Sequence, residues 1–464
     1  MKLKLFTLAA ILGLASTKSY AQYITTTQFQ NPQSVSNDGL IAGYAAWAGP
    51  YLIWNADTDK VEAIGGIAPG NNHGGVATFT PDGKYISGTS QTSTDPTVGE
   101  MSRYNTITKK WETLGFNYNT GESNSDFSSG YFISGDGNTV VGLSYLKSTN
   151  PEGTIVKRPT AYAWNSSKGG VNLEPFNPSA KQGRANAVSN DGSVIIGWSD
   201  MRGPWKAHYW KRNPDGTYQK GQYILVDPKG SSTNEFNQLG EARAISGNGK
   251  WIGGKSDAAF ENAWLWSEET GVVDLGKIAK PEENNVQSWV TSINYDATIV
   301  LGYTISKQWA DSAPVYTPWI WTKETGIQDF NNYVTNTLKF DMKGDKIYVP
   351  TQLSENEKYI IGWGVDATNI KMFRIQLPAK LATDEVKNHV EITLFPNPVS
   401  NELNIDSKDN IKEVTVFNLT GQQLFSKKGN SKTSKIDVSN LKSGVYIVEV
   451  KTDKTSKTYK VIKK

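Results

Sequence analysis

Short apolar runs recur along the chain, and each follows a polar turn and ends at a glycine. The clearest copy begins at Ser134-Gly135-Asp136-Gly137 and ends at Gly142. Six further copies start with a small polar residue and end with a glycine, at residues 36–43, 80–88, 189–197, 246–254, 294–302 and 354–362. An apolar run after an Asp-Gly or Asn-Gly pair is typical of a β-strand that leaves a tight turn. The recurrence predicts a repeat architecture.

Two more strands follow each run. The first is aromatic, at residues 51–54, 102–104, 161–164, 207–210, 263–266 and 318–321. After a polar turn, a fourth short strand ends each unit, at residues 61–64, 111–114, 171–173, 223–226, 272–275 and 327–330. Because the pattern lacks the 3.6-residue period of helices, it predicts antiparallel four-stranded sheets.

Seven four-stranded units of about 50 residues indicate a seven-bladed β-propeller over residues 22–378. The seventh unit lacks a fourth strand, whereas residues 23–29 form a spare strand near the start of the chain. We expect this spare strand to pair with residues 372–375 and close the ring, which removes an open sheet edge. Two stacked β-sandwiches are the alternative.

The phrase Ser-x-Asp-Gly, followed by an aromatic-Trp strand and a Gly-Val-x-x-Leu strand, resembles the extracellular HAF repeat family over most of residues 30–377. Two units depart from it, because Ala297 and Glu357 replace the turn glycine. The resemblance implies the fold and an extracellular location, and no activity.

The first 21 residues predict a secretory signal peptide. Lys2 and Lys4 precede an apolar stretch at residues 5–14, and cleavage is expected between Ala21 and Gln22. A buried N-terminal helix is the alternative. No other stretch is long and apolar enough for a transmembrane segment.

Residues 391–464 predict a small C-terminal β-sandwich, joined by a polar linker at residues 379–390. Its motifs resemble the type A C-terminal sorting domain of type IX secretion in Bacteroidetes. The matching positions include Pro396, Asn397, Pro398, Gly421, Gly444, Tyr446, Lys463 and Lys464. The resemblance implies two partners, the type IX machinery and its sorting protease, and a product that is anchored to lipopolysaccharide or released. An accessory binding sandwich is the alternative.

Charge and cysteine content narrow the function. The chain has a net charge of +3, of which residues 1–21 contribute +3 and residues 391–464 contribute +5, so residues 22–390 carry −5. A mildly acidic propeller argues against nucleic acid as the partner. The chain has no cysteine, so an exported form is held together without disulfides.

The sequence predicts no metal and no cofactor. The three histidines, His73, His208 and His389, are not spaced as metal ligands. We expect His208 to be a half-buried structural residue. The Asp and Asn residues of the repeated turns could be calcium ligands, but one per blade suits turn formation better.

The propeller topology places the loops between blades and those between second and third strands on one face. We expect long loops there at residues 90–100, 144–160, 199–205 and 304–318. We expect the residue five positions before the repeated Ser to lie at the rim of the central channel. The candidate ligand-binding residues are His73, Arg184, Trp205, Glu241, Arg243, Trp289 and Trp309. Ordinary loop packing is the alternative for these residues.

Three functions remain open. We expect a surface or secreted protein that binds a glycan, a peptide or a protein on the long-loop face, since Arg and Trp can hold an acidic sugar or a peptide. A secreted carbohydrate-active or peptide-cleaving enzyme is the alternative, with Glu241 as its one rim carboxylate and Asp257 one loop away. The third is a structural element of an extracellular matrix. Because no catalytic pair is evident, the sequence favours a binding function, and we predict no catalytic residue.

Overall fold

The chain forms two compact units in this computed structural model, residues 1–379 and 380–464. The structure describes residues 22–464 apart from 29–30, 45–48, 68–73, 92–97, 116–126, 150–152, 178–181, 201–203, 280–283, 308–311, 379–391, 419–421 and 454–455. The expected signal peptide, with Ala21 at its end, lies outside the described residues.

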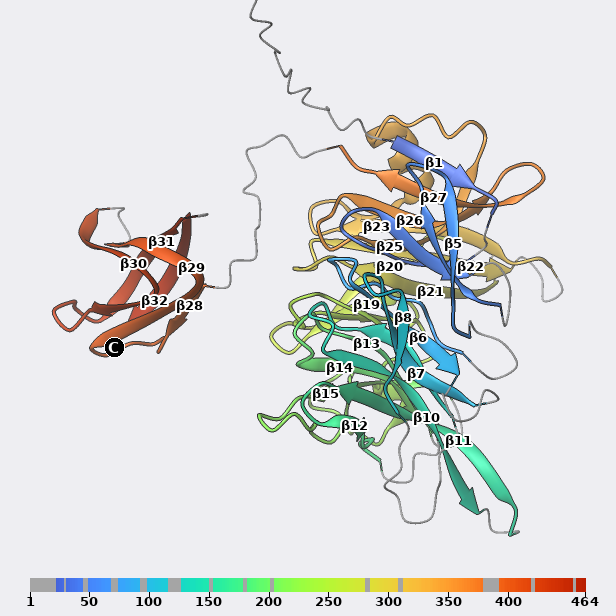
Figure 1. Ribbon diagram of the computed structural model, residues 1–464, viewed down its shortest axis with the longest axis horizontal. Helices are drawn as coiled ribbons and strands as arrows, with labels where there is room; N and C mark the ends of the chain where they lie inside the picture. The colour runs from blue at the N-terminus through green and yellow to red at the C-terminus, as the bar shows by residue number, and fades with distance from the viewer. Residues whose placement is uncertain are drawn as a thin grey trace, which may run out of the picture. The chain divides into compact units, whose positions relative to one another are not determined.

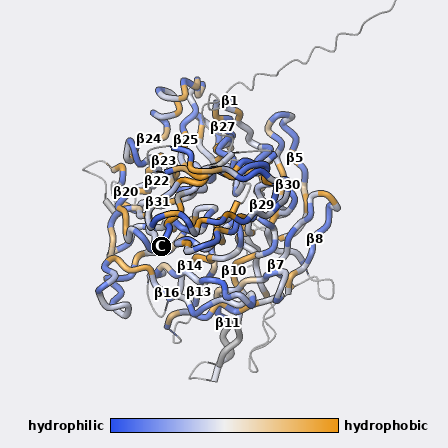
Figure 2. Tube along the Cα trace, turned by 90° about the vertical axis from the view of Figure 1, so that its left-hand side faces the viewer, coloured by the Kyte–Doolittle hydropathy of each residue, from blue (hydrophilic) through white to orange (hydrophobic). Residues whose placement is uncertain are grey.

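The first unit is a seven-bladed β-propeller, as the repeat predicts. Its blades follow one another around the ring in chain order (Figures 1 and 2). The first blade contains β2 (Asn31–Val35), β3 (Leu40–Tyr44), β4 (Tyr51–Asn55) and β5 (Lys60–Gly65). The second contains β6 (Tyr85–Gln91), β7 (Gly99–Asn105) and β8 (Lys110–Thr113). The third contains β9 (Ser128–Ile133), β10 (Thr139–Thr149), β11 (Ile155–Asn165) and β12 (Gly169–Asn172). In the second blade, a single bridge from Phe79 to Ile86 takes the place of the innermost strand.

The remaining blades are four-stranded. The fourth blade contains β13 (Gln182–Val188), β14 (Val194–Asp200), β15 (Lys206–Lys211) and β16 (Gln222–Tyr223), and the fifth contains β17 (Ala242–Ile245), β18 (Ile252–Gly254), β19 (Ala263–Ser267) and β20 (Gly271–Gly276). The sixth contains β21 (Asn284–Ile293), β22 (Ile299–Lys307), β23 (Val315–Thr322) and β24 (Gly326–Asp329). The seventh contains β25 (Lys346–Leu353), β26 (Tyr359–Val365), β27 (Ile370–Gln376) and the N-terminal strand β1 (Gln22–Thr26). Short helical segments lie outside the sheets: η1 (Glu235–Asn237), α1 (Phe330–Asn332) and η2 (Tyr333–Thr337).

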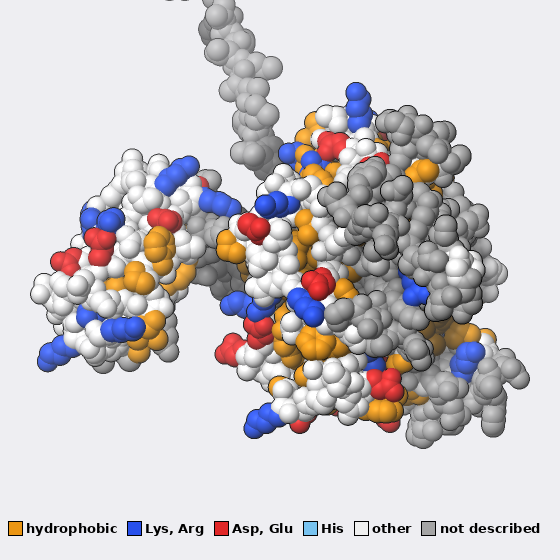
Figure 3. All heavy atoms as spheres, turned by 90° about the horizontal axis from the view of Figure 1, so that it is seen from below, with side chains coloured by type: hydrophobic (Ala, Val, Ile, Leu, Met, Phe, Trp, Pro, Cys, Tyr) orange, Lys and Arg blue, Asp and Glu red, His pale blue; other side chains and the backbone are white. Residues whose placement is uncertain are grey.

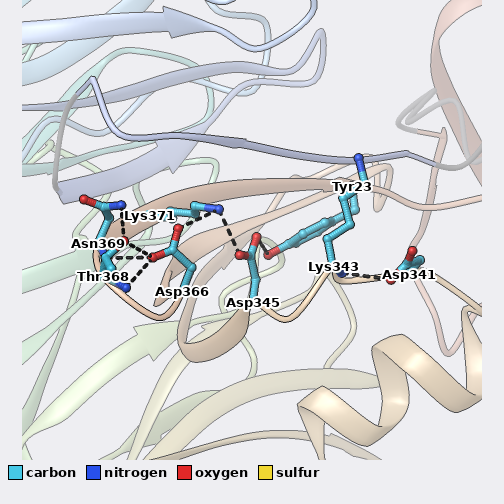
Figure 4. Close-up of polar contacts among 8 residues, drawn as sticks. All are labelled: Tyr23, Asp341, Lys343, Asp345, Asp366, Thr368, Asn369 and Lys371. Atoms are coloured by element: carbon cyan, nitrogen blue, oxygen red, sulfur yellow. Dashed lines mark hydrogen bonds and ion pairs between the residues drawn. The ribbon is translucent and has the colours of Figure 1, made fainter.

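The N-terminal strand closes the ring. β1 pairs antiparallel with β27, with Tyr23 opposite Ile375 and Thr25 opposite Phe373, which confirms the expected closure. The Tyr23 hydroxyl donates to Asp345 at 3.3 Å, and Lys371 forms ion pairs with Asp345 at 2.9 Å and Asp366 at 3.0 Å (Figure 4). The seventh blade therefore depends on both ends of the propeller sequence.

Large aromatic side chains fill the core between neighbouring blades. Trp54, Trp210, Trp264 and Trp319, all from third strands, are almost completely buried. Trp54, for example, packs in one cluster with Ile361 and Met372 of the seventh blade. The aromatic strands thus supply the apolar burial that holds one blade against the next.

The repeated phrase forms the same turn in each unit. In the third unit, the Ser134 hydroxyl donates to Asp136 at 2.5 Å and accepts from the backbone N–H of Thr139 at 2.9 Å. The turn needs a left-handed residue, and Gly137 has φ of 73°. Ala297 and Glu357 adopt the same conformation, with φ of 58° and 57°. The turn geometry therefore persists where the glycine is replaced.

Two of the expected long loops are mostly strand. Residues 144–160 extend the β10–β11 hairpin, with Ser144 opposite Thr160 and Thr149 opposite Ile155. Residues 304–318 likewise extend β22 and β23, with Thr304 opposite Thr317. The prediction was wrong there because antiparallel pairing satisfies the backbone groups of these polar segments, whose composition alone favours a loop.

The second unit is a small β domain. It contains β28 (Ile392–Phe395), β29 (Glu402–Phe417), β30 (Gln423–Asp437), β31 (Gly444–Thr452) and β32 (Ser456–Lys463). The long β29 pairs with β28 along its first half and with β31 along its second half. Both halves contribute to one core, through Leu403 and Ile405 and through Val414 and Val416. This unit therefore has a hydrophobic core of its own.

Candidate functional site

The candidate site lies at the end of the fourth to sixth blades where the innermost strands begin. Arg184 in β13, Glu241 next to β17 and Trp289 in β21 stand five positions before the repeated polar residue of their units. The structure joins these three through a chain of contacts that also includes Arg243. We call Arg184, Glu241, Arg243, Lys255 and Trp289 the rim cluster.

A buried carboxylate organises the rim cluster. Glu241 is only 2% exposed, and its Oε1 accepts hydrogen bonds from Arg184 Nη2 at 3.1 Å, Asn186 Nδ2 at 2.9 Å and Arg243 Nη1 at 3.2 Å. Burial alone would raise the pKa of Glu241, but Arg243 and Arg184 outweigh it and hold that pKa below its usual value. Glu241 is therefore ionised at neutral pH.

A β-bulge in each innermost strand directs side chains into this region. Ala185 and Ala187 of β13 pair with Gly197 and Ile196, so Asn186 is an extra residue. The same irregularity makes Arg243 the extra residue of β17 and Tyr131 that of β9. A bulge re-aims a side chain, which explains why polar and aromatic groups converge here from different blades.

The glycine that ends each apolar run permits the bulge. A Cβ on Gly197 would lie 1.9 Å from the Arg184 carbonyl oxygen, and one on Gly302 would lie 2.2 Å from that of Trp289. Such distances are far shorter than any van der Waals contact. The repeated glycine is therefore needed for the close backbone approach that positions the rim cluster.

Cations in the rim cluster lie against aromatic rings. Arg243 and Lys255 stand 5.0 and 4.4 Å from the Trp289 ring centre, and Arg184 stands 4.7 Å from that of Tyr131. Burial lowers the pKa of Lys255, although Glu241 opposes this. Among the described residues, no carboxylate lies within ion-pair distance of Lys255. The rim cluster thus has three cations for one carboxylate.

An exposed tryptophan borders the rim cluster. Trp205 is 44% exposed and stacks flat on Trp198, with ring centres 4.2 Å apart. Arg184 lies 5.9 Å from the Trp205 ring centre. Trp205 therefore presents a fixed aromatic face to solvent.

The channel of the ring is narrow below this region. The residue before the repeated Ser, Thr or Asn lines the same cavity of about 80 Å³ in all seven units: Val35, Phe79, Ile133, Val188, Ile245, Ile293 and Leu353. Arg243 also lines this cavity. The channel has room for a few water molecules, so a larger ligand must bind at the rim.

The other candidate residues are placed as follows. His73 and Trp309, like His389, lie outside the described residues. His208 is completely buried, and burial lowers its pKa to about 4, so it is a neutral core residue. The sequence does not identify Tyr131, Asn186, Trp198 and Lys255 as site residues. For Tyr131 and Asn186, the repeated glycine is the sequence signal, because it permits the bulge that directs their side chains into the site.

Several sorting positions make hydrogen bonds within the second unit. Asn397 Oδ1 accepts from the backbone N–H of Ile462 at 2.8 Å, and Val399, next to Pro398, accepts from that of Lys464 at 2.9 Å. The Tyr446 hydroxyl donates to the Lys442 carbonyl at 2.8 Å. Pro396, Gly444 and Lys463 lie in the same domain, and Gly421 lies outside the described residues. The Pro-Asn-Pro segment thus holds the last strand.

The described residues also bear on metal binding and membrane insertion. Within the described ranges, no group of His, Cys, Asp and Glu is arranged to hold a metal ion. None of the helices in the described part of the chain is long and apolar enough to cross a membrane. On the face seen in Figure 3, basic and acidic side chains are interspersed among the described residues.

Comparison with known proteins identifies the second unit. Residues 393–464 match the secretion system C-terminal sorting domain, which indicates export through the type IX system to the cell surface or the extracellular space. No curated protein matches the chain.

Solved structures resemble the propeller. An oligogalacturonate lyase from Vibrio parahaemolyticus is 12% identical over 77% of this chain and 92% of its own, with a TM-score of 0.45. A periplasmic gluconolactonase from Pseudomonas aeruginosa is 11% identical over 89% of this chain and 99% of its own, with a TM-score of 0.38.

Proposed function

We propose that the propeller is an exported binding protein whose ligand contacts the rim cluster. One observation carries this: Arg184, Arg243 and Lys255 converge from neighbouring blades around one carboxylate and leave a surplus of positive charge. A structural ion pair needs only matched charges, whereas unmatched cations beside an exposed Trp suit a ligand of negative charge. Trp205 supplies that aromatic face.

The proposal extends to the route of delivery. Residues 1–21 direct the chain across the inner membrane, and the sorting domain directs it through the type IX system. The sorting protease then cleaves the linker at residues 379–390, and the propeller is released or anchored to lipopolysaccharide. The separate core of the second unit supports this, because its removal takes no residue from the propeller core.

Hydrolysis of a glycan is not favoured by the rim cluster. A glycosidase needs a carboxylic acid with a raised pKa beside a second carboxylate. The pKa of Glu241 is lowered by Arg243 and Arg184, and Asp257 is held by Lys206 at 2.6 Å. Glu241 is therefore better suited to orient the two arginines than to donate a proton.

Array screening tests the proposal. The purified full chain is applied to glycan and peptide arrays, and each hit is repeated with Arg184→Gln and Arg243→Gln. We expect a hit that both variants weaken by at least roughly tenfold, which corresponds to one charge-assisted hydrogen bond. Lys109→Met is the matched control, because Lys109 pairs with Glu62 on the outer surface.

Hits that survive both arginine variants would contradict a ligand at the rim cluster. Thermal unfolding of each variant shows whether a lost hit reflects the site or the fold.

A further inference from the structure

We infer that the ligand is an acidic oligosaccharide whose carboxylate is bound by Arg243 and Lys255 and whose sugar ring packs on Trp205. The inference rests on the proposed function and names the ligand class. It joins three features of the rim: a surplus of cations, a fixed aromatic face and a channel too narrow to enter.

The charges select an anion. Arg184 and Arg243 share Oε1 of Glu241, so that carboxylate neutralises one of the two guanidinium groups. Arg243 keeps a 35% exposed side chain, and Lys255 lies on the same Trp289 ring. A guanidinium group binds a carboxylate through two parallel hydrogen bonds, and a nearby ammonium group adds a third donor. These two cations form the carboxylate site.

The aromatic groups select a sugar. Trp205 stacks on Trp198 with an interplanar angle of 9°, so its outer face is flat, fixed and open to solvent. The C–H groups on one side of a pyranose ring pack against such a face, while its hydroxyl groups stay hydrated. Because the Trp205 ring is already held by its stacking on Trp198, binding costs little conformational entropy.

More half-buried aromatic rings continue from Trp289 toward the seventh blade. Tyr303 stacks on Trp289 at 6.0 Å, Tyr316 follows at 6.1 Å, and Tyr316 stacks on Tyr348 at 5.6 Å. A row of rings gives room for additional sugar units beyond the one at Trp205. The ligand is therefore an oligosaccharide rather than a single sugar.

Three buried polar atoms in the region also lack a partner. Glu241 Oε2, Trp198 Nε1 and Trp289 Nε1 make no hydrogen bond with the described residues. Buried polar atoms seldom remain unpaired, and a ligand rich in hydroxyl groups supplies donors and acceptors, directly or through water. An apolar ligand would leave all three atoms unsatisfied.

An acidic peptide fits the rim less well. An extended peptide gains most of its affinity by adding to a free sheet edge. At the rim, Trp289 of β21 is already bridged to Lys255, and the inner edges of β13 and β17 face the axial cavity, whose volume of about 80 Å³ does not admit a strand. Flat aromatic faces with isolated cations favour the sugar.

Matched probes test the inference. Binding of the full chain is measured by calorimetry with hexasaccharides of alginate, galacturonate and hyaluronan, each beside its carboxyl-reduced form, and with hexaglutamate. We expect at least one uronate hexasaccharide to bind, with affinity that falls as salt rises. Its carboxyl-reduced form should bind roughly tenfold more weakly or worse.

Variants assign the contacts. Lys255→Met should reproduce the loss caused by carboxyl reduction, and Trp205→Ala should weaken charged and reduced sugars alike. Lys109→Met and Phe236→Ala are the controls, since both residues are exposed and lie outside the rim cluster. The controls should leave binding unchanged.

The outcomes separate this inference from the proposed function. Equal binding of charged and reduced sugars, or binding of hexaglutamate without any uronate, overturns the acidic oligosaccharide. In that case the proposed function still holds if Arg184→Gln weakens the binding that is seen. If no probe or array ligand depends on Arg184, both are overturned.

Discussion

The guanidinium group of Arg184, in the fourth blade, donates a hydrogen bond at 3.1 Å to the carboxylate of Glu241, in the fifth blade. The same oxygen atom accepts from Arg243, whose backbone is displaced by a bulge. One buried carboxylate therefore fixes two guanidinium groups across a blade boundary. The rim cluster is organised before any ligand arrives, which reduces the entropy lost on binding.

Replacing the carboxylate should destabilise the propeller. Glu241→Gln leaves three cations without a counter-charge, and we expect the free energy of unfolding to fall by about 2 kcal/mol. This is below the cost of breaking a fully buried pair, because the side chains of Arg184 and Arg243 are 18% and 35% exposed. Urea unfolding at pH 7 measures the change.

The effect should depend on pH. The pKa of Glu241 is lower in the folded protein than its ordinary value of 4.5, so the carboxylate stabilises the fold fully above pH 4.5. That stabilisation is lost as the pH falls further, and the stability difference between wild type and Glu241→Gln should shrink. Glu112→Gln, which breaks a partly exposed pair with Arg103, is the control and should cost under about 1 kcal/mol. A constant difference down to pH 3 would contradict the role of the ionised form.

The repeated glycine links stability to the site. In Gly197→Ala, the new methyl group would stand 1.9 Å from the Arg184 carbonyl oxygen, so the backbone of β13 has to move. We expect a loss of about 3 kcal/mol and weaker ligand binding, since Arg184 and Asn186 move with it. Calorimetric unfolding and the array hit measure the two effects.

Gly271→Ala is the matched control for Gly197→Ala. Gly271 has φ of 68° but no atom within 4 Å of an added methyl group, so only backbone strain is introduced. We expect a cost of about 1 kcal/mol and unchanged ligand binding. Equal costs for the two variants would show that the bulge tolerates a side chain.

The repeat predicted the architecture because it marks equivalent positions in every blade. Once the repeated Ser was identified, Arg184, Glu241 and Trp289 followed as neighbours around one rim. The sequence also predicts Arg243 near them, but not Asn186, because Asn186 reaches the site through a bulge that shifts the alternation of side chains by one residue. Gly197 was visible in the sequence, but its contact with the Arg184 carbonyl depends on how the two strands pair.

Other features depend on contacts between distant residues. Lys255 directly follows β18, and a backbone bridge to Trp289 of the next blade, together with the contact between the two side chains, places it in the rim cluster. Residues 144–160 look like a polar loop, yet they pair with one another as a hairpin. In both cases local composition carries no information about the neighbour that decides the structure.

The closing strand should contribute strongly to stability. Tyr23 packs on Phe373 with ring centres 6.2 Å apart, and its hydroxyl donates to Asp345. We expect Tyr23→Ala to lower the free energy of unfolding by about 3 kcal/mol, because the ring leaves a cavity beside β27. Tyr23→Phe keeps the ring and removes one hydrogen bond, so it should cost about 1 kcal/mol. Similar losses for both variants would assign the closure to the hydroxyl group rather than to packing.

Deletion of the sorting domain should block export without unfolding the propeller. The core of residues 393–464 is built from its own side chains, such as Leu403, Val414 and Val448, while β1 closes the propeller independently. We therefore expect a chain that ends at residue 392 to accumulate in the periplasm as a protease-resistant propeller. Fractionation followed by limited proteolysis measures both properties. Lys435→Met, which removes one exposed ion pair with Glu402 and lies outside the sorting positions, is the control and should be exported normally. Truncated protein that reaches the cell surface or the medium would contradict a sorting role, whereas periplasmic protein that proteases degrade would show that the propeller needs its second unit to fold.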